Sequence, residues 1–280
     1  MGLTGVLCKL QILFNPVLFF RIIKENRFLL WQLVLRNISI RYRGAFLGLL
    51  WSFVQPLLML CVYTFVFSVV FKARWGGTES GRGAFAIIMF CGMALFSVFS
   101  ESVSSSCRII LGNQNYVKKV IFPLEILPLA QCLSTFILGF AWLVLLFFGT
   151  VFVYGSLNWT MLLLPLILIP LFLFTCGICF FVASLGVYLR DTQYIVGVIL
   201  QILFFMTPIF YSINSVPARY RWPLQMNPLT ILIEEARRIF LFGKLPNWTF
   251  LGIAFLIGVV VLHLGFVWFY KTKRGFADVL

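Results

Sequence analysis

The sequence predicts an all-α protein that crosses a membrane several times. Hydrophobic residues make up 62% of the 280 positions, and charged residues only 11%. A soluble globular domain carries about a quarter charged residues, so most of this chain must lie in an apolar solvent. Several apolar stretches reach the roughly 20 residues that a helix needs to cross a bilayer core. Within lipid, an α-helix satisfies its own backbone hydrogen bonds, which favours helices for these stretches.

Six apolar stretches are long enough to be spans, and they place residues 1–280 in a single transmembrane domain. Spans one to five fall within residues 46–211 and span six within residues 249–270. Prolines in the third and fourth spans predict tilted or kinked helices. The six predicted spans are Phe46–Phe71, Ala84–Ser104, Leu124–Tyr154, Met161–Leu189, Tyr194–Tyr211 and Thr249–Tyr270.

The basic residues lie at the ends of the spans. The net charge is +14, but no face or run gathers these residues as a nucleic-acid-binding surface would, so we expect no nucleic-acid partner. They suit the positive-inside rule and contacts with anionic membrane lipids. Fourteen of the 22 basic residues fall on one side of the six-span arrangement. This bias predicts a bacterial inner-membrane protein with both termini in the cytoplasm.

Residues 16–43 are too charged to cross the bilayer and too apolar to float free of it. Trp31, Leu35, Ile38 and Tyr42 recur at helical spacing, with arginines between them. The pattern predicts an amphipathic helix on the cytoplasmic leaflet. Such a helix either anchors the first span or takes part in docking a soluble partner.

The second span becomes polar toward its inner end. Ser97, Ser100, Glu101 and Ser104 follow an i, i+3, i+4, i+7 pattern on one helix face. A carboxylate at this depth must meet water, a partner or another helix. Glu101 therefore pairs with Arg108 or with a neighbouring span, or else it lines a wet pathway.

The segment Ser212–Trp248 is too broken by its four prolines to be a further span. It also contains a helical run with two glutamates and two arginines, in which Ile231, Leu232 and Phe240 form part of an apolar side. We expect a pair of short re-entrant or interfacial helices at the outer face, with "MNPLT" as the turn.

Enzyme chemistry has little support in the sequence. No GxxxxGK[ST] loop occurs, so the chain itself is not expected to hydrolyse nucleotide. Cys176 and Cys179 form a CxxC, but it lies mid-span without a nearby His and is interpreted as apolar packing. We expect no metal site and no cofactor bound by this chain.

Four segments in order resemble the membrane subunits of ABC exporters for polysaccharides and polyol phosphates, of the O-antigen or teichoic-acid type. They are "NISIRYRGAFLGLLWSFVQPLLMLCVYTFVFS", "NYVKKVIFPLEILPLA", "YLRDTQYIVGVILQILFFMTPIFY" and "MNPLTILIEEAR". The resemblance implies a homodimer of six-span permease subunits with two separate ATPase subunits, which would bind ATP and Mg. Its implied task is to move an undecaprenyl-diphosphate-linked polysaccharide from the cytoplasmic to the outer side of the membrane.

The resemblance also assigns roles to residues. The strip "NYVKKVIFPLEILP" between spans two and three would couple to the ATPase, although its lysines alone are equally suited to positive-inside anchoring. Tyr116 and Phe122 would fill an apolar cleft of the partner, and Glu125 would clamp a neighbouring base. The predicted coupling residues are Asn115, Tyr116, Lys118, Lys119, Phe122, Pro123 and Glu125.

Two further groups of residues are predicted to meet the substrate. Arg41, Tyr42 and Arg43 would face its diphosphate at the cytoplasmic opening. Aromatic rings stack weakly on sugars and let a glycan slide, although many Phe residues simply face lipid. The predicted pathway residues are Trp51, Phe53, Ser97, Ser100, Glu101, Phe204, Phe205 and Tyr211.

Three other functions stay open at this stage. The substrate of an ABC exporter could be teichoic acid, or a drug or small lipid. A channel or structural assembly factor that uses no ATP is the third alternative. An ATPase that co-purifies with the chain would separate the exporters from this last alternative.

Overall fold

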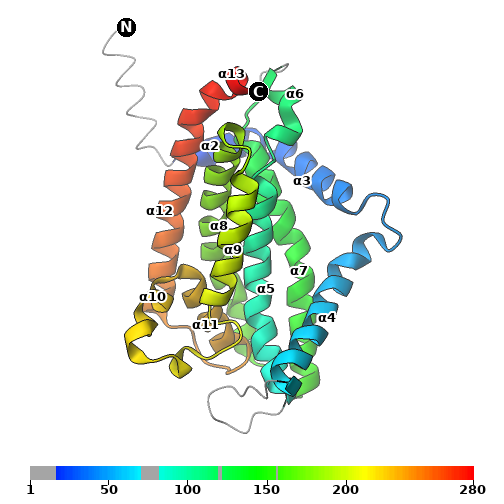
Figure 1. Ribbon diagram of the computed structural model, residues 1–280, viewed down its shortest axis with the longest axis vertical. Helices are drawn as coiled ribbons and strands as arrows, with labels where there is room; N and C mark the ends of the chain where they lie inside the picture. Colours follow the sequence, from blue (N-terminus) through cyan, green and yellow to red (C-terminus); the bar gives the residue numbers. More distant parts are fainter. Residues whose placement is uncertain (1–16, 71–81, 119–121, 156) are drawn as a thin grey trace.

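The protein is described here from a computed structural model, which covers residues 17–70, 82–118, 122–155 and 157–280. In these ranges the chain is helical and contains no strand (Figure 1). Five helices are long and apolar enough to cross a membrane, which confirms the all-α polytopic prediction. They are Gly48–Phe67, Gly83–Ser106, Ile126–Tyr154, Trp159–Tyr188 and Trp248–Val279.

The bundle is centred on α5. Of its apolar span, 72% is buried inside the protein, against 11% for the span that contains α4. α7 packs against one side of α5, and α8 connects it to α12. The helices of this bundle are α4 (Trp51–Tyr63, continued by the π-helix η2, Thr64–Val70), α5 (Arg82–Ser106), α7 (Ile126–Tyr154), α8 (Leu164–Tyr188, preceded by the 3₁₀-helix η4, Trp159–Leu163) and α12 (Trp248–Thr272).

Small residues let α8 and α12 pack closely. A Cβ on Gly265 of α12 would lie only 2.0 Å from the carbonyl oxygen of Gly177 on α8. Glycines at such crossings let two backbones approach within a membrane, where the apolar solvent offers no hydrophobic force for association. Pro170 lies inside α8 and is buried.

The predicted C-terminal limit of the fifth span, Tyr211, was wrong. The helix α9 (Thr192–Met206) has 15 residues and stops five positions before the predicted limit. Thr207 is extended (φ −85°, ψ 133°), because the ring of Pro208 disfavours the helical conformation in the residue before it. α9 measures about 22 Å and falls short of membrane length, so a sixth crossing stays a prediction.

The N-terminal amphipathic helix differs from its prediction in two ways. It is divided into α2 (Val17–Glu25) and α3 (Arg27–Tyr42), and the side chain of Asn26 between them donates to the Ile22 carbonyl at 2.9 Å. The buried face of α3 is also a different one. Its three buried side chains pack toward α7, whereas Trp31 and Leu35, on the predicted apolar face, are 54% and 49% exposed. The buried residues are Leu30, Leu33 and Val34.

The segment 212–248 forms the predicted helix pair, α10 (Arg221–Met226) and α11 (Pro228–Phe240). Asn227 begins α11, because its side chain accepts a hydrogen bond from the Leu229 amide at 3.0 Å. The turn thus falls within "MNPLT", as predicted. The depth of this pair in a membrane stays a prediction.

The two ends of the bundle are built differently (Figure 1). α10 and α11 lie at one end, preceded by the 3₁₀-helices η5 (Ile213–Ser215) and η6 (Ala218–Tyr220). At the other end lie short elements between and after the long helices. These are η3 (Leu111–Asn113), α6 (Gln114–Lys118), η7 (Lys273–Gly275) and α13 (Phe276–Val279), whereas η1 (Gly48–Leu50) begins the first span between α3 and α4.

Candidate functional site

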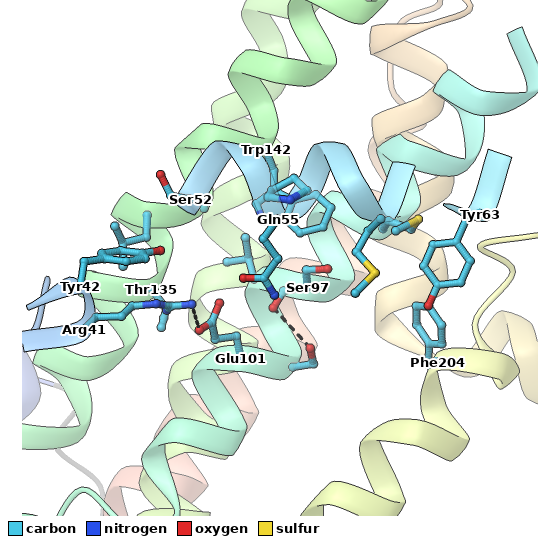
Figure 2. Close-up of a pocket in the computed structure, with 17 residues that line it drawn as sticks. Arg41, Tyr42, Ser52, Gln55, Tyr63, Ser97, Glu101, Thr135, Trp142 and Phe204 are labelled. Atoms are coloured by element: carbon cyan, nitrogen blue, oxygen red, sulfur yellow. Dashed lines mark hydrogen bonds and ion pairs between the residues drawn. The ribbon is translucent and has the colours of Figure 1, made fainter. Parts of the chain in front are cut away.

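A polar cavity of about 270 Å³ opens among the helices of this apolar bundle (Figure 2). Helices α3, α4, α5, α7 and α9 all contribute to its wall, so residues distant in the sequence meet there. Its polar and aromatic lining consists of Arg41, Tyr42, Ser52, Gln55, Tyr63, Ser97, Ser100, Glu101, Thr135, Trp142 and Phe204.

An ion pair between α3 and α5 forms part of the wall of this cavity. The Arg41 guanidinium at the end of α3 contacts the Glu101 carboxylate on α5 (Figure 2). The side chains are 30% and 39% exposed, so the chain itself encloses neither charge completely. The partner of Glu101 is thus Arg41 of the amphipathic helix α3, and not Arg108 or a residue of a neighbouring span as predicted. The carboxylate also lines the cavity.

Tyr42 stands beside this pair. The Arg41 guanidinium lies 5.4 Å from the centroid of the Tyr42 ring. Partial burial is the main cause that raises the pKa of the Tyr42 hydroxyl, with the Arg41 charge acting in the opposite direction. The hydroxyl therefore stays protonated at neutral pH and can donate a hydrogen bond to an anion.

Three cavities share Glu101. The second, of about 640 Å³, lies between α3, α5 and α7 and is lined by Arg36, Arg41 and Gln131 among others. The third, of about 420 Å³, lies between α5 and α9. The serines that share a face with Glu101, Ser97, Ser100 and Ser104, line the third one, as their spacing suggested. The Arg41–Glu101 pair thus stands where the three cavities meet.

The structure brings together only part of the predicted pathway set. Ser97, Ser100, Glu101 and Phe204 line the first cavity, and so do Arg41 and Tyr42. Arg43 is exposed at the end of α3 and does not line it.

Four predicted aromatic residues lie away from this cavity. Trp51 and Phe53 are exposed on α4, and Phe205 is 60% exposed on α9. Tyr211 follows the break after α9, where its hydroxyl donates to the Phe205 carbonyl at 3.1 Å. These rings do not line this cavity, because helix faces rather than residue type decide which rings point toward it, and their place in a pathway stays a prediction.

Sequence reasoning missed several lining residues. Gln55 on α4 and Thr135 and Trp142 on α7 all face the cavity (Figure 2). Gln55 carried a signal, because an amide within the apolar run "WSFVQPLL" needs a polar partner. Gln131, which lines the second cavity, is likewise an isolated amide in an apolar span.

The predicted coupling strip forms α6 and the turn that leads into α7. The Tyr116 ring stacks on Phe122, with 4.5 Å between ring centroids and an interplanar angle of 20°. Both rings are half-buried against the protein's own core, so less of them is free for a partner than predicted. Asn115 and Lys118 are exposed. Lys119 lies outside the described residues.

The end of the strip is fastened to the C-terminal segment. The buried Glu125 carboxylate pairs with Lys273, which is the clamp on a base that the sequence suggested. The Pro123 carbonyl accepts a hydrogen bond from the Ile126 amide at 3.0 Å, at the residue where α7 begins. Phe276 of α13 is fully buried, with its ring centroid 5.9 Å from that of Tyr188.

A fully buried arginine holds the opposite end together. Arg237 on α11 donates to three backbone carbonyls and to Glu234, and its side chain has no exposed surface. A Cβ on Gly92 of α5 would lie 2.9 Å from its Nη2, so only glycine leaves room there. The four acceptors are Ile88 O (3.2 Å), Pro208 O (2.8 Å), Ile209 O (3.0 Å) and Glu234 Oε1 (2.8 Å).

Cysteines and acids do not assemble a metal site in the described part of the chain, where no group of three His, Cys, Asp or Glu side chains could hold an ion. Cys176 and Cys179 of the CxxC are fully buried in the core. They contribute apolar packing between helices.

A bundle of membrane-length helices with polar cavities between them is the architecture of a membrane transport protein. Residues 28–241 match the ABC-2 type transporter family, and the chain belongs to that family. It is thus a permease-type subunit with several membrane-spanning helices.

The relatives of this chain bear the names of polysaccharide exporters. It is 30% identical over 260 residues to the O-antigen export system permease protein RfbA of Myxococcus xanthus, covering 91% of this chain and 96% of the relative. It is 28% identical over 248 residues to RfbA of Klebsiella pneumoniae, covering 88% and 92%. The polysialic acid transport protein KpsM of Escherichia coli is 24% identical over 254 residues, covering 86% and 92%.

Proposed function

We propose that this chain is the membrane subunit of an ATP-driven exporter that moves an undecaprenyl-diphosphate-linked, O-antigen-like polysaccharide outward across the inner membrane. The observation that carries the proposal is the partly exposed Arg41–Glu101 pair where three cavities meet inside an apolar bundle. Polar groups are placed at such depth only where they serve a pathway or a partner. The names of the relatives point to the same class of substrate.

In this proposal the diphosphate of the lipid carrier meets Arg41, Tyr42 and Arg43. A guanidinium offers paired donors that suit phosphate oxygens. The glycan then passes Ser97, Ser100, Glu101 and Phe204. The exposed rings of Trp51 and Phe53 would join the pathway where a second subunit closes it, and Phe205 and Tyr211 stay predicted members.

ATP and Mg would be bound by a separate ATPase subunit, because this chain has no nucleotide-binding loop. The strip from Asn115 to Glu125 would contact this ATPase subunit and follow its movement. A homodimer with two ATPase subunits is the proposed assembly. It is supported by the span of α4, which is apolar yet 11% buried in one chain.

The proposed topology has six crossings, with α9 as the fifth, re-entrant α10 and α11 outside, and both termini in the cytoplasm. A variant without its native cysteines would receive single cysteines at exposed Ser39 and Trp222 in turn. An impermeant maleimide added to intact spheroplasts should label position 222 and spare position 39. Labelling of position 39 alone would show that the chain has the opposite orientation in the membrane.

The function is tested by depleting the protein in its native host and measuring the lipid-linked glycan pool. A cell with an ATPase-inactive partner subunit serves as the control. We expect undecaprenyl-linked polymer to accumulate inside while surface polymer is lost in both strains. An unchanged pool with normal surface polymer would overturn the proposal and favour a drug or small-lipid exporter.

Two other outcomes distinguish the remaining alternatives. Accumulation of a polyol-phosphate polymer would identify a teichoic-acid exporter. A defect after depletion that the ATPase-inactive control does not reproduce would indicate a channel that works without ATP.

A further inference from the structure

A single arginine connects the strip with the helix that carries the ion pair. Arg36 on α3 donates from Nη1 to the Tyr116 hydroxyl at 3.1 Å and from Nη2 to Asn113 Oδ1 at 3.0 Å. Its guanidinium also lies 5.8 Å from the centroid of the Tyr116 ring. Tyr116 belongs to α6, which forms the first part of the strip, and Asn113 belongs to η3, which directly precedes α6.

These contacts need an arginine rather than any cation. The planar guanidinium presents several donors in a fixed fork, so it can bond two acceptors and face an aromatic ring at the same time. A lysine carries one ammonium on a flexible stem and cannot hold this geometry. Arg36, Asn113 and Tyr116 are all half-buried, which shields their hydrogen bonds from competing water.

The neighbouring residue fastens α3 to the bundle. The Asn37 side chain donates to Gln131 Oε1 on α7 at 3.2 Å, and Gln131 donates to Ser105 Oγ on α5 at 3.0 Å. The polar chain therefore runs from the strip through α3 and α7 to α5. Ser105 lies one helical turn beyond Glu101 on α5.

Arg41 lies five positions after Arg36 on the same helix. This spacing corresponds to about 7.5 Å along an α-helix, which is rigid over such a length. A displacement of Tyr116 therefore moves α3 through Arg36, and α3 carries Arg41 relative to Glu101. No other hydrogen bond between α3 and the strip is found among the described residues.

We propose that Arg36 is the positioning residue that transmits movement of the ATPase-facing strip to the Arg41–Glu101 pair, and so couples ATP hydrolysis to opening of the cytoplasmic cavity. This inference rests on the proposed function, because it requires an ATPase at the strip. It adds a residue that touches neither substrate nor partner but sets how much polymer is moved for each ATP hydrolysed.

The test uses the full chain in complex with its own ATPase subunit. Arg36→Gln is compared with wild type for three quantities: ATPase co-purified per permease, ATP hydrolysis by the purified complex, and surface polymer in cells. We expect the first two to be retained and surface polymer to fall about tenfold, because the variant loses the charged hydrogen bonds of the guanidinium to Tyr116 and Asn113.

Arg27→Gln is the matched control. Arg27 lies on the same helix, is exposed, and is not used in the link, so this variant should behave as wild type. Tyr116→Phe removes only the acceptor hydroxyl and keeps the ring, and we expect a smaller loss of the same kind. The double variant should be no worse than Arg36→Gln alone, because both remove one link.

Retention of the wild-type ratio of polymer to ATP in Arg36→Gln would overturn the inference, as would an equal loss in Arg27→Gln. If Arg36→Gln does not accumulate in the membrane, Tyr116→Phe alone decides. A wild-type ratio of surface polymer to ATP hydrolysed in Tyr116→Phe would then overturn the inference. Failure of the proposed function looks different, because the wild-type chain itself would then export no polymer.

Discussion

Two of the arginine–glutamate pairs among the described residues differ in burial and in the number of their other partners. Arg237 and Glu234 lie at the end of the bundle with α10 and α11, and the arginine is completely buried and bonded to three further carbonyls. Arg41 and Glu101 lie at the cavity junction, with side chains 30% and 39% exposed. The first arginine has all its partners within the chain, whereas the second can exchange its carboxylate for an incoming anion. Burial and the number of acceptors thus separate a structural charge from a usable one.

The largest effect is expected at the buried pair. Arg237→Met should destabilise the protein by about 3–5 kcal/mol, because it leaves buried carbonyls and a carboxylate without their donor. Thermal unfolding of the purified protein in detergent measures this loss. A melting temperature close to wild type would show that the guanidinium is not needed to join α11 to α5.

Gly92→Ala tests the space around the same arginine. The new methyl would meet Nη2 of Arg237 at 2.9 Å and Ile233 Cγ2 at 3.3 Å, so one of them must shift. We expect a destabilisation of about 1–3 kcal/mol from this overpacking. Gly252→Ala is the matched control, since a Cβ on Gly252 of α12 meets nothing within 4 Å and alanine favours the helix. Equal melting temperatures for both variants would contradict the tight fit.

The Arg41–Glu101 pair should affect export strongly and stability little, which is the opposite of the buried pair. Arg41→Gln is expected to change the free energy of unfolding by less than about 1 kcal/mol, as exposed pairs do. Surface polymer should nevertheless fall at least tenfold, since the diphosphate loses its main donor. Glu101→Gln serves as the companion variant. A large loss of stability with export preserved would assign Arg41 a structural role.

The smallest effect is expected at a third, exposed ion pair. Arg21 and Glu25 on α2 lie four residues apart at 2.7 Å, and their side chains are 71% and 57% exposed. Arg21→Gln should leave both the melting temperature and surface polymer unchanged, because water screens such pairs. A clear defect would show that α2 contacts a partner through this arginine.

Composition was sufficient to predict the five membrane-length helices, because an apolar stretch of that length has few alternatives. The predicted third span, Leu124–Tyr154, and the observed helix, Ile126–Tyr154, differ by two residues at one end. The face of α3 could not be predicted in the same way. A helix at a membrane surface meets both lipid and protein, so two apolar faces compete, and the one with Leu33 and Val34 packs on the bundle.

Local periodicity predicted only the part of the candidate site that lies on one helix. Ser97, Ser100 and Glu101 follow a periodic pattern, and they line one cavity. The partners Arg41 and Arg36 come from a segment that the local pattern does not connect with α5 or the strip. Long-range contacts of this kind depend on how the helices pack, which the periodicity of one segment does not contain.

The early end of α9 has a consequence for the surrounding lipid. Its 15 residues cover about 22 Å, whereas the hydrocarbon core of a bilayer is about 30 Å thick. Ile195, Val198, Ile199 and Ile202 are exposed along this helix, and in the proposed six-crossing topology acyl chains would contact them. Such a hydrophobic mismatch is relieved by local thinning of the bilayer, at a fraction of a kcal/mol per Å. A membrane thinned on the α9 flank shortens the distance over which a polar polymer must leave water.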